Sequence, residues 1–124
     1  MKATSVNAAV FSSGAENVIR FYEEDFGFKV IHKTELSGAL APLSFMVSME
    51  DGNGDRLDVI QLDGAASDVN GLRINTDYFE DAVAAYGKLG YSAAYGPAIA
   101  DSAMTVLLTK NGGAPVLLIQ HIQK

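Results

Sequence analysis

A few polar side chains lie in apolar, strand-like segments where they could do chemistry. Arg73 lies in the segment Gly71–Asn75, and its guanidinium could hold a carboxylate or phosphate through two parallel hydrogen bonds. An ion pair with an acidic side chain is the competing interpretation. His121 could act as a general base, helped by His32 if both face the same way, and a half-exposed structural histidine is again the alternative.

Several other chemistries lack the residues that they need. The chain contains no cysteine, which excludes disulfides, thiolate zinc sites and cysteine nucleophiles. No serine or lysine lies in a recognisable activated context, so nucleophilic catalysis has no support, and we assign no catalytic residue. The loop Asp51–Asp55 opens like a calcium loop, but Arg56 occupies the place of the required glycine. We therefore predict a hairpin turn there.

Charge and hydropathy exclude two classes of partner. The formal net charge is −6, and the nine Lys and Arg residues are scattered, whereas nucleic-acid binding needs clustered cations. No apolar run of signal-peptide length follows Met1, and no segment approaches the ~18 apolar residues that span a bilayer. We expect a cytoplasmic protein that binds neither nucleic acid nor membrane.

A first helix is predicted over residues 15–26. Ser13 and Glu16 have the spacing of a capping box, in which each side chain accepts a hydrogen bond from a free amide at the helix start. Apolar residues then recur at helical spacing, and Gly27 can adopt the left-handed conformation that ends a helix. Both ends of this helix are therefore marked in the sequence.

A second helix is predicted over residues 78–89, with Thr76 or Asp77 capping its start and Gly90 ending it. Gly90 follows Gly27 by 63 residues, and the hydroxyl residues that precede the two helices are the same distance apart. A shared period of this kind indicates an internal duplication.

Segments rich in β-branched and apolar residues predict strands around both helices. They cover residues 5–11, 29–36, 43–49 and 56–62 in the first half, and 71–75, 92–95, 104–109 and 115–122 in the second. The order is βαβββ twice. We interpret residues 1–124 as a single domain, with module 1 at about 1–63, a small polar linker at about 64–70 and module 2 at about 71–124.

Three segments carry a resemblance to a known family. The segment Arg20–Val30 reads RFYEEDFGFKV, and it is followed in the second half by Leu89–Tyr91 and by Asn111–Ile119. Together they resemble the vicinal oxygen chelate superfamily, which includes glyoxalases, bleomycin-resistance proteins and extradiol dioxygenases. The resemblance implies an α+β fold in which two tandem βαβββ modules form a U-shaped, mostly antiparallel mixed sheet, with helices on the convex side. It also implies a site on the concave side and a homodimer.

Metal-dependent members of that superfamily take His or Glu ligands from the first and fourth strands of each module. The resemblance places these positions at Asn7, Gln61, Gly71 (or Leu72 with a one-residue slip) and Leu117. None of these residues is a histidine or a carboxylate, whereas a catalytic divalent ion needs about three such ligands. We therefore predict a member without the metal ligands, with no metal and no cofactor.

Strand alternation predicts the residues that face the concave side. In the first strand Asn7, Ala9 and Phe11 should face inward while Val6, Ala8 and Val10 face the helices. The same count, applied to the other inner strands, predicts a pocket with an apolar wall and a few polar groups, a normal composition for a small-molecule site. The predicted ligand-binding residues are Asn7, Phe11, Gln61, Arg73, Asn75 and His121.

These observations favour a metal-independent protein that binds or sequesters a small organic ligand, as glyoxalase-like and bleomycin-resistance-like proteins do. A lyase, isomerase or dioxygenase-type enzyme of the same superfamily, with or without a metal, is one alternative. A structural or interaction module with a filled cavity is the other. The charge of the ligand stays open, because overall acidity favours a cation and Arg73 favours an anion.

Overall fold

The computed structural model describes residues 3–122. Its first half contains β1 (Ala3–Ser12), α1 (Ala15–Phe26), β2 (Lys29–Glu35), β3 (Leu43–Glu50) and β4 (Arg56–Leu62). Its second half contains β5 (Val69–Thr76), α2 (Phe79–Lys88), β6 (Ser92–Ala100), β7 (Ala103–Thr109) and β8 (Val116–His121). The repeated βαβββ order predicted from the sequence is confirmed.

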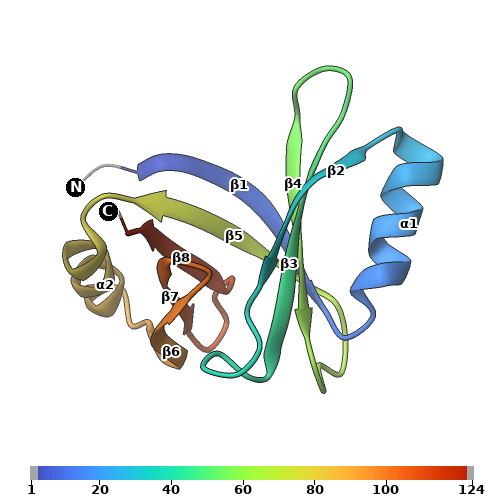
Figure 1. The fold of residues 1–124 in the computed structure, drawn as a ribbon. Coiled ribbons are helices and arrows are strands. Elements are labelled where there is room, and N and C mark those ends of the chain that lie inside the picture. The colour runs from blue at the N-terminus through green and yellow to red at the C-terminus, as the bar shows by residue number, and fades with distance from the viewer. Residues whose placement is uncertain (1–2, 123–124) are drawn as a thin grey trace.

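All strands form one curled, mixed sheet in the order β2-β3-β4-β1-β5-β8-β7-β6 (Figure 1). The first strands of the two modules, β1 and β5, are antiparallel neighbours at its centre. Each also lies parallel to the fourth strand of its own module, β1 beside β4 and β5 beside β8. Figure 1 shows α1 and α2 on the outer side of the curl, one against each half. The predicted α+β fold is confirmed.

The start of α1 lies where it was predicted, but the predicted capping box is wrong. No side-chain cap comes from the residues around the helix start. Instead the backbone amide of Ala15 donates to Oε1 of Gln61 (2.9 Å), and Nε2 of Gln61 donates to the carbonyl of Ser13 (2.7 Å). The end is as predicted, because Gly27 has a left-handed φ of 72°. The side chain of Gln61, from β4, therefore caps α1 in place of a residue next to the helix.

The second module repeats this arrangement with Gln120. The hydroxyl of Thr76, one of the two predicted caps, accepts from the amide of Tyr78 (3.0 Å), directly before α2. The amide of Phe79 donates to Oε1 of Gln120 (2.9 Å), and Nε2 of Gln120 donates to the carbonyl of Asp77 (3.0 Å). A glutamine near the end of the fourth strand thus holds the start of the helix in both halves.

We predict that Gln61→Ala lowers the free energy of unfolding by about 1 kcal/mol, because the amide of Ala15 and the carbonyl of Ser13 lose their hydrogen-bond partner. Gln61 also donates to Oδ1 of Asp63 (2.8 Å). Hydrogen bonds from Ser44 and then Gln61 lower the pKa of Asp63 below 3.8, so the substitution should raise this pKa. Urea denaturation and carboxyl NMR titration measure the two effects. Gln120→Ala is the matched variant: it should cost a similar free energy and leave the pKa of Asp63 unchanged.

The helices bury the outer face of the sheet. Under α1 the cluster contains Val10, Ala15, Val47, Met49, Leu57 and Val59. Under α2 it contains Phe79, Ala82, Val106, Leu108, Val116 and Leu118. No helix within residues 3–122 has both the length and the apolar character that a membrane span requires.

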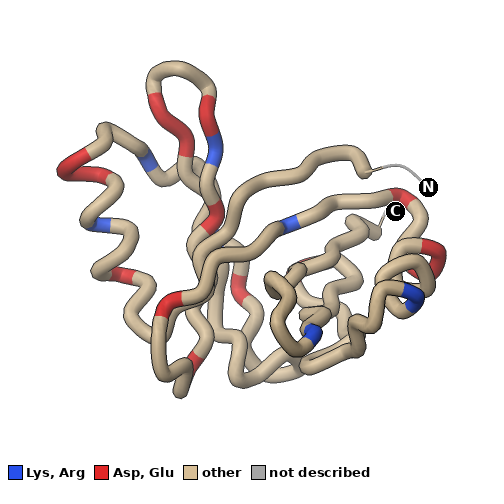
Figure 2. The backbone as a smooth tube through the Cα atoms, turned by 180° about the vertical axis from the view of Figure 1, so that it is seen from behind, with Lys and Arg blue, Asp and Glu red and all other residues tan. Residues whose placement is uncertain are grey.

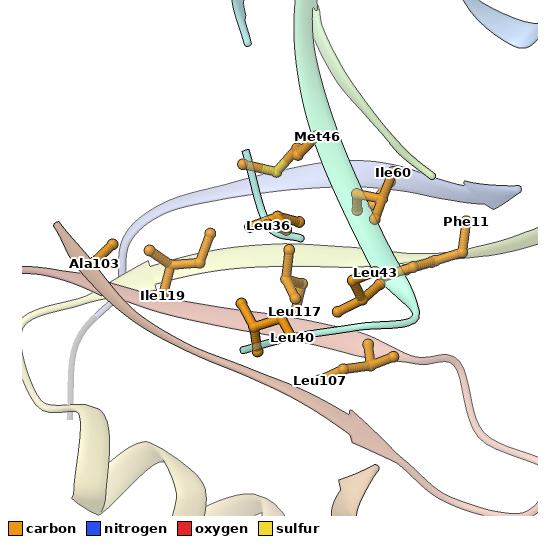
Figure 3. Close-up of a cluster of buried hydrophobic side chains, with 11 residues drawn as sticks. Phe11, Leu36, Leu40, Leu43, Met46, Ile60, Ala103, Leu107, Leu117 and Ile119 are labelled. Carbon is orange, nitrogen blue, oxygen red and sulfur yellow. The ribbon is translucent and has the colours of Figure 1, made fainter. Parts of the chain in front are cut away.

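A third apolar cluster lies inside the curl, between the two halves of the sheet (Figure 3). It takes Phe11 and Ile60 from module 1, and Leu117 and Ile119 from module 2. Leu36 and Leu40 of the connection between β2 and β3, and Leu43 at the start of β3, cover this face, and each is at most 1% exposed. The middle of the concave side is therefore packed with large apolar side chains.

Candidate functional site

A buried ion pair lies on the concave face beside the apolar cluster. Nε of Arg73 donates to Oδ2 of Asp58 at 2.9 Å, and the two side chains are 9% and 0% exposed. The same carboxylate accepts from Nδ2 of Asn7 (3.1 Å) and from the hydroxyl of Ser48 (2.5 Å). Both oxygens of Asp58 are thus hydrogen-bonded, as a buried carboxylate requires.

Three adjacent strands position this pair. In the sheet β1 separates β4 from β5, so Arg73 on β5 reaches across β1 to meet Asp58 on β4. Its neighbour across the β1–β5 ladder is Asn7, and the β1 residue beside Asp58 is Ala9. A guanidinium has the length for this span, and the small Ala9 side chain leaves space on that face.

The remaining donors of Arg73 are only partly used. Nη1 donates to Oδ1 of Asn75 at 2.6 Å and to the hydroxyl of Ser5 at 3.3 Å. Nη2 has no acceptor among residues 3–122. No buried side-chain nitrogen or oxygen of the described part lacks a partner, so solvent reaches Nη2. Arg73 therefore keeps one free pair of N–H donors although its side chain is nine-tenths buried.

The structure brings three of the predicted ligand-binding residues together: Asn7, Arg73 and Asn75. The alternation predicted for β1 and β5 is confirmed. Ala9 and Phe11 of β1 join the concave cluster while Val10 packs under α1, and Ile74 of β5 packs against the α2 cluster while Arg73 points to the opposite face. The predicted alternative for Arg73, an ion pair with an acidic side chain, is present.

His121 lies at the same end of the face as Asn75. Asn75 is paired with Ile119, and His121 is the second residue beyond Ile119 on β8. Its side chain is exposed.

Two predicted positions differ from the expected pocket. The prediction that Gln61 faces the concave side is wrong, because its side chain caps α1 on the outer side. Phe11 does face inward, but it is 1% exposed and belongs to the packed cluster, as Ile119 does. The expected open cavity is therefore absent from the middle of the face, where these side chains meet Leu40 and Leu43.

Asp58 is the functional candidate that sequence reasoning missed. It lies in the run Leu57–Ile60, and its lone carboxylate among buried apolar residues was the available signal. On β4 it faces the concave side, as does the buried Ile60, and Gln61 faces outward. The fourth-strand position that meets Asn7 is therefore Asp58.

The donors around this position do not fit the divalent metal that the resemblance implies. Asp58 is already paired with Arg73, whose positive charge would repel an ion. In module 2 the matching ladder position is the buried apolar Leu117. A Cβ at Gly71 would lie 2.2 Å from the carbonyl oxygen of Pro115, so no ligand side chain can be accommodated there without moving the backbone. No cluster of three His, Cys, Asp or Glu residues exists within the described chain.

A hollow of about 810 Å³ lies beside His121, between the start of α2 and the end of β8; we name it the α2 hollow. Its acidic lining residues are Asp77, Glu80 and Asp81, and Gln120 and His121 also line it. A smaller hollow of about 390 Å³ lies at the start of α1, where Gln61 and Asp63 line it. The two hollows are equivalent places in the two modules.

Comparison with known proteins shows the fold. No family model matches the sequence, and no curated protein matches it. Streptomyces coelicolor methylmalonyl-CoA epimerase, solved in complex with 2-nitronate-propionyl-CoA, aligns with a TM-score of 0.64 and 15% identity over 98% of this chain and 100% of its own.

Two further solved structures align in the same way. A hypothetical protein from Bacillus halodurans C-125 aligns with a TM-score of 0.63 and 11% identity, over 100% of this chain and 98% of its own. Methylmalonyl-CoA epimerase from Mycobacterium tuberculosis aligns with a TM-score of 0.62 and 13% identity, over 99% of this chain and 94% of its own. These neighbours belong to the vicinal oxygen chelate superfamily. The chain therefore has the paired βαβββ fold of the vicinal oxygen chelate superfamily.

Proposed function

We propose that this protein binds a small organic molecule without a metal, at the end of the concave face where Arg73, Asn75 and His121 lie. The observation that carries the proposal is the free Nη2 of Arg73 on a side chain that is nine-tenths buried. Binding proteins commonly place a few polar donors at an otherwise apolar wall. Ile119, which is nearly buried and is paired with Asn75 between β5 and β8, supplies such a wall at this end.

Of the predicted ligand-binding residues, His121 lines the α2 hollow, whose volume of about 810 Å³ lies in the range of roughly 300–1,000 Å³ that small-molecule sites occupy. Solved neighbours of the same fold bind acyl-CoA compounds. Their activity does not transfer at 15% identity, so the ligand class has to come from this chain's own residues.

Native mass spectrometry of the purified protein tests the proposal. We expect a metal-free chain with a co-purified organic mass, and no metal uptake when Zn²⁺, Ni²⁺ or Mn²⁺ is added. The double variant Asp58→Leu with Arg73→Met should lose the organic mass, and Gln61→Ala should retain it. Stoichiometric metal on each chain would contradict metal independence and favour a lyase, isomerase or dioxygenase. The same spectra give the subunit count and so test the homodimer that we also propose, in a protein that we place in the cytoplasm.

A second candidate function is an interaction module that binds no ligand. The packed cluster inside the curl favours it, because Leu36, Leu40 and Leu43 fill the middle of the concave side. Under this function the wild type and the double variant would carry no organic mass and would respond equally to every small molecule tested.

A further inference from the structure

Arg73 is the single charged residue on the two central strands. β1 has none, and β5 has only Arg73. Figure 2 shows the consequence from behind: the two long central tubes are almost free of charge, whereas α1 and the β3–β4 hairpin carry many charged residues. Because a lone charge in the middle of a sheet is costly to bury, its presence needs a reason.

The fold itself does not supply that reason. In the β1–β4 ladder Ala9 is the partner of Asp58, and in the β5–β8 ladder Arg73 is the partner of Leu117. Ala9 of module 1 therefore corresponds to Arg73 of module 2, and Asp58 of module 1 corresponds to Leu117 of module 2. At each of the two positions one module has a charged residue and the other an uncharged one. Alanine and leucine satisfy the same two positions within one chain, and buried ion pairs are on average no better for stability than apolar replacements. We infer that the pair is kept for its chemistry.

The guanidinium of Arg73 can donate hydrogen bonds to a ligand while its positive charge is compensated by Asp58. Asp58 compensates the charge of Arg73 at 2.9 Å. An anion at Nη2 would therefore meet a cation whose charge is already compensated.

The charge of the protein also disfavours anions. The carboxylate of Asp58 lies 2.9 Å from Nε of Arg73, and the whole chain has a net charge of −6. An anionic ligand that approaches an acidic protein beside a carboxylate is repelled, and this repulsion is weakened but not removed by salt. An uncharged acceptor oxygen avoids the repulsion and still accepts the free N–H pair.

We propose that Nη2 of Arg73 binds an uncharged carbonyl oxygen, of the ketone or amide type, and rejects carboxylates and phosphates. This inference rests on the proposed function and specifies its ligand class. The guanidinium, held by Asp58 and Asn75, is a fixed donor at the place where the resemblance would put a metal ion. Overall acidity favours a cationic ligand and Arg73 favours an anionic one. An uncharged ligand resolves this conflict, because the charge of Arg73 is already compensated by Asp58.

Matched pairs of small probes test this proposal. The protein is labelled with ¹⁵N-arginine, and the Arg73 side-chain signal is assigned from its absence in the Asp58→Leu, Arg73→Met double variant. Benzamide and cyclohexanecarboxamide are titrated against benzoate and cyclohexanecarboxylate at constant ionic strength. We expect the amides to shift the Arg73 signal saturably and the acids to bind at least about tenfold more weakly.

Asp58→Asn is the decisive variant, because it removes the compensating charge and leaves one acceptor oxygen. We expect benzoate to bind at least about tenfold more tightly than to the wild type, with benzamide nearly unchanged. Asp63→Asn, which removes an equal charge from an exposed carboxylate of module 1, should change neither affinity. If Asp58→Asn does not fold, the comparison of acids with amides on the wild type decides alone.

The outcomes separate the two proposals. Acids that bind the wild type as tightly as their amides would overturn the ligand class and leave ligand binding at Arg73 intact. An Arg73 signal that no probe shifts would overturn both this inference and the placement of the ligand site at Arg73. A benzoate affinity unchanged in Asp58→Asn would show that Asp58 does not set the charge preference.

Discussion

Asp58→Ala is expected to lower the free energy of unfolding by about 3–5 kcal/mol, because it leaves the guanidinium of Arg73 buried without its counter-charge. Arg73 is 9% exposed, so water can compensate only part of the loss. Asn7 and Ser48 would also lose their acceptor. Urea denaturation, with the slope checked for two-state behaviour, measures the change.

The double variant Asp58→Leu with Arg73→Met is the control for this result. It removes both charges and fills the space with apolar side chains, as Leu117 does in module 2. We expect it to cost much less than either single change, which gives a coupling energy of about 2 kcal/mol or more in a double-mutant cycle. Additive effects would show that the pair contributes little and would weaken the case for a preserved charged centre.

Gly71→Ala is expected to lower the free energy of unfolding by about 2–4 kcal/mol, because the new Cβ has no space. It would lie 2.2 Å from the carbonyl oxygen of Pro115 and 2.9 Å from Cε1 of Phe11. The Pro115 carbonyl accepts a hydrogen bond from the amide of Leu72, so moving it would also weaken that bond. Differential scanning calorimetry and urea denaturation both detect an effect of this size.

Gly87→Ala is the matched control for the steric argument. Gly87 lies within α2, a Cβ added there would meet nothing within 4 Å, and its φ is not left-handed. Alanine there should raise stability by up to about 1 kcal/mol, because glycine is a poor helix former. Equal effects of the two substitutions would contradict the close packing at Gly71, and with it the structural reason why this strand position cannot provide a metal ligand.

Together these variants distinguish stability from function. Gly71 and its contacts with Pro115 close one position of the metal site implied by the family resemblance. Asp58 and Arg73 fill another part of it with an ion pair. Substitutions at Gly71 should therefore change stability alone, whereas substitutions at Asp58 should change both stability and the preference between uncharged and anionic probes.

Local sequence signals determined much of the fold. The sequence predicts helix α1 over residues 15–26, and the helix lies there, because its apolar spacing and Gly27 are local features. The repeated βαβββ order and the alternation of β1 and β5 follow from local patterns in the same way. Alternation alone also assigns Asn7, Arg73 and Asn75 to one face, where their hydrogen bonds now connect them.

Only the tertiary structure decided how these pieces combine. The face of Gln61 and the importance of Asp58 depend on the register of β4 against β1, and a shift of one residue exchanges the two faces of a strand. The true helix caps, Gln61 and Gln120, lie more than forty residues from Ala15 and Phe79, so no local motif could indicate them. The packed concave side depends on Leu40 in the β2–β3 connection, whose path is set by long-range apolar packing.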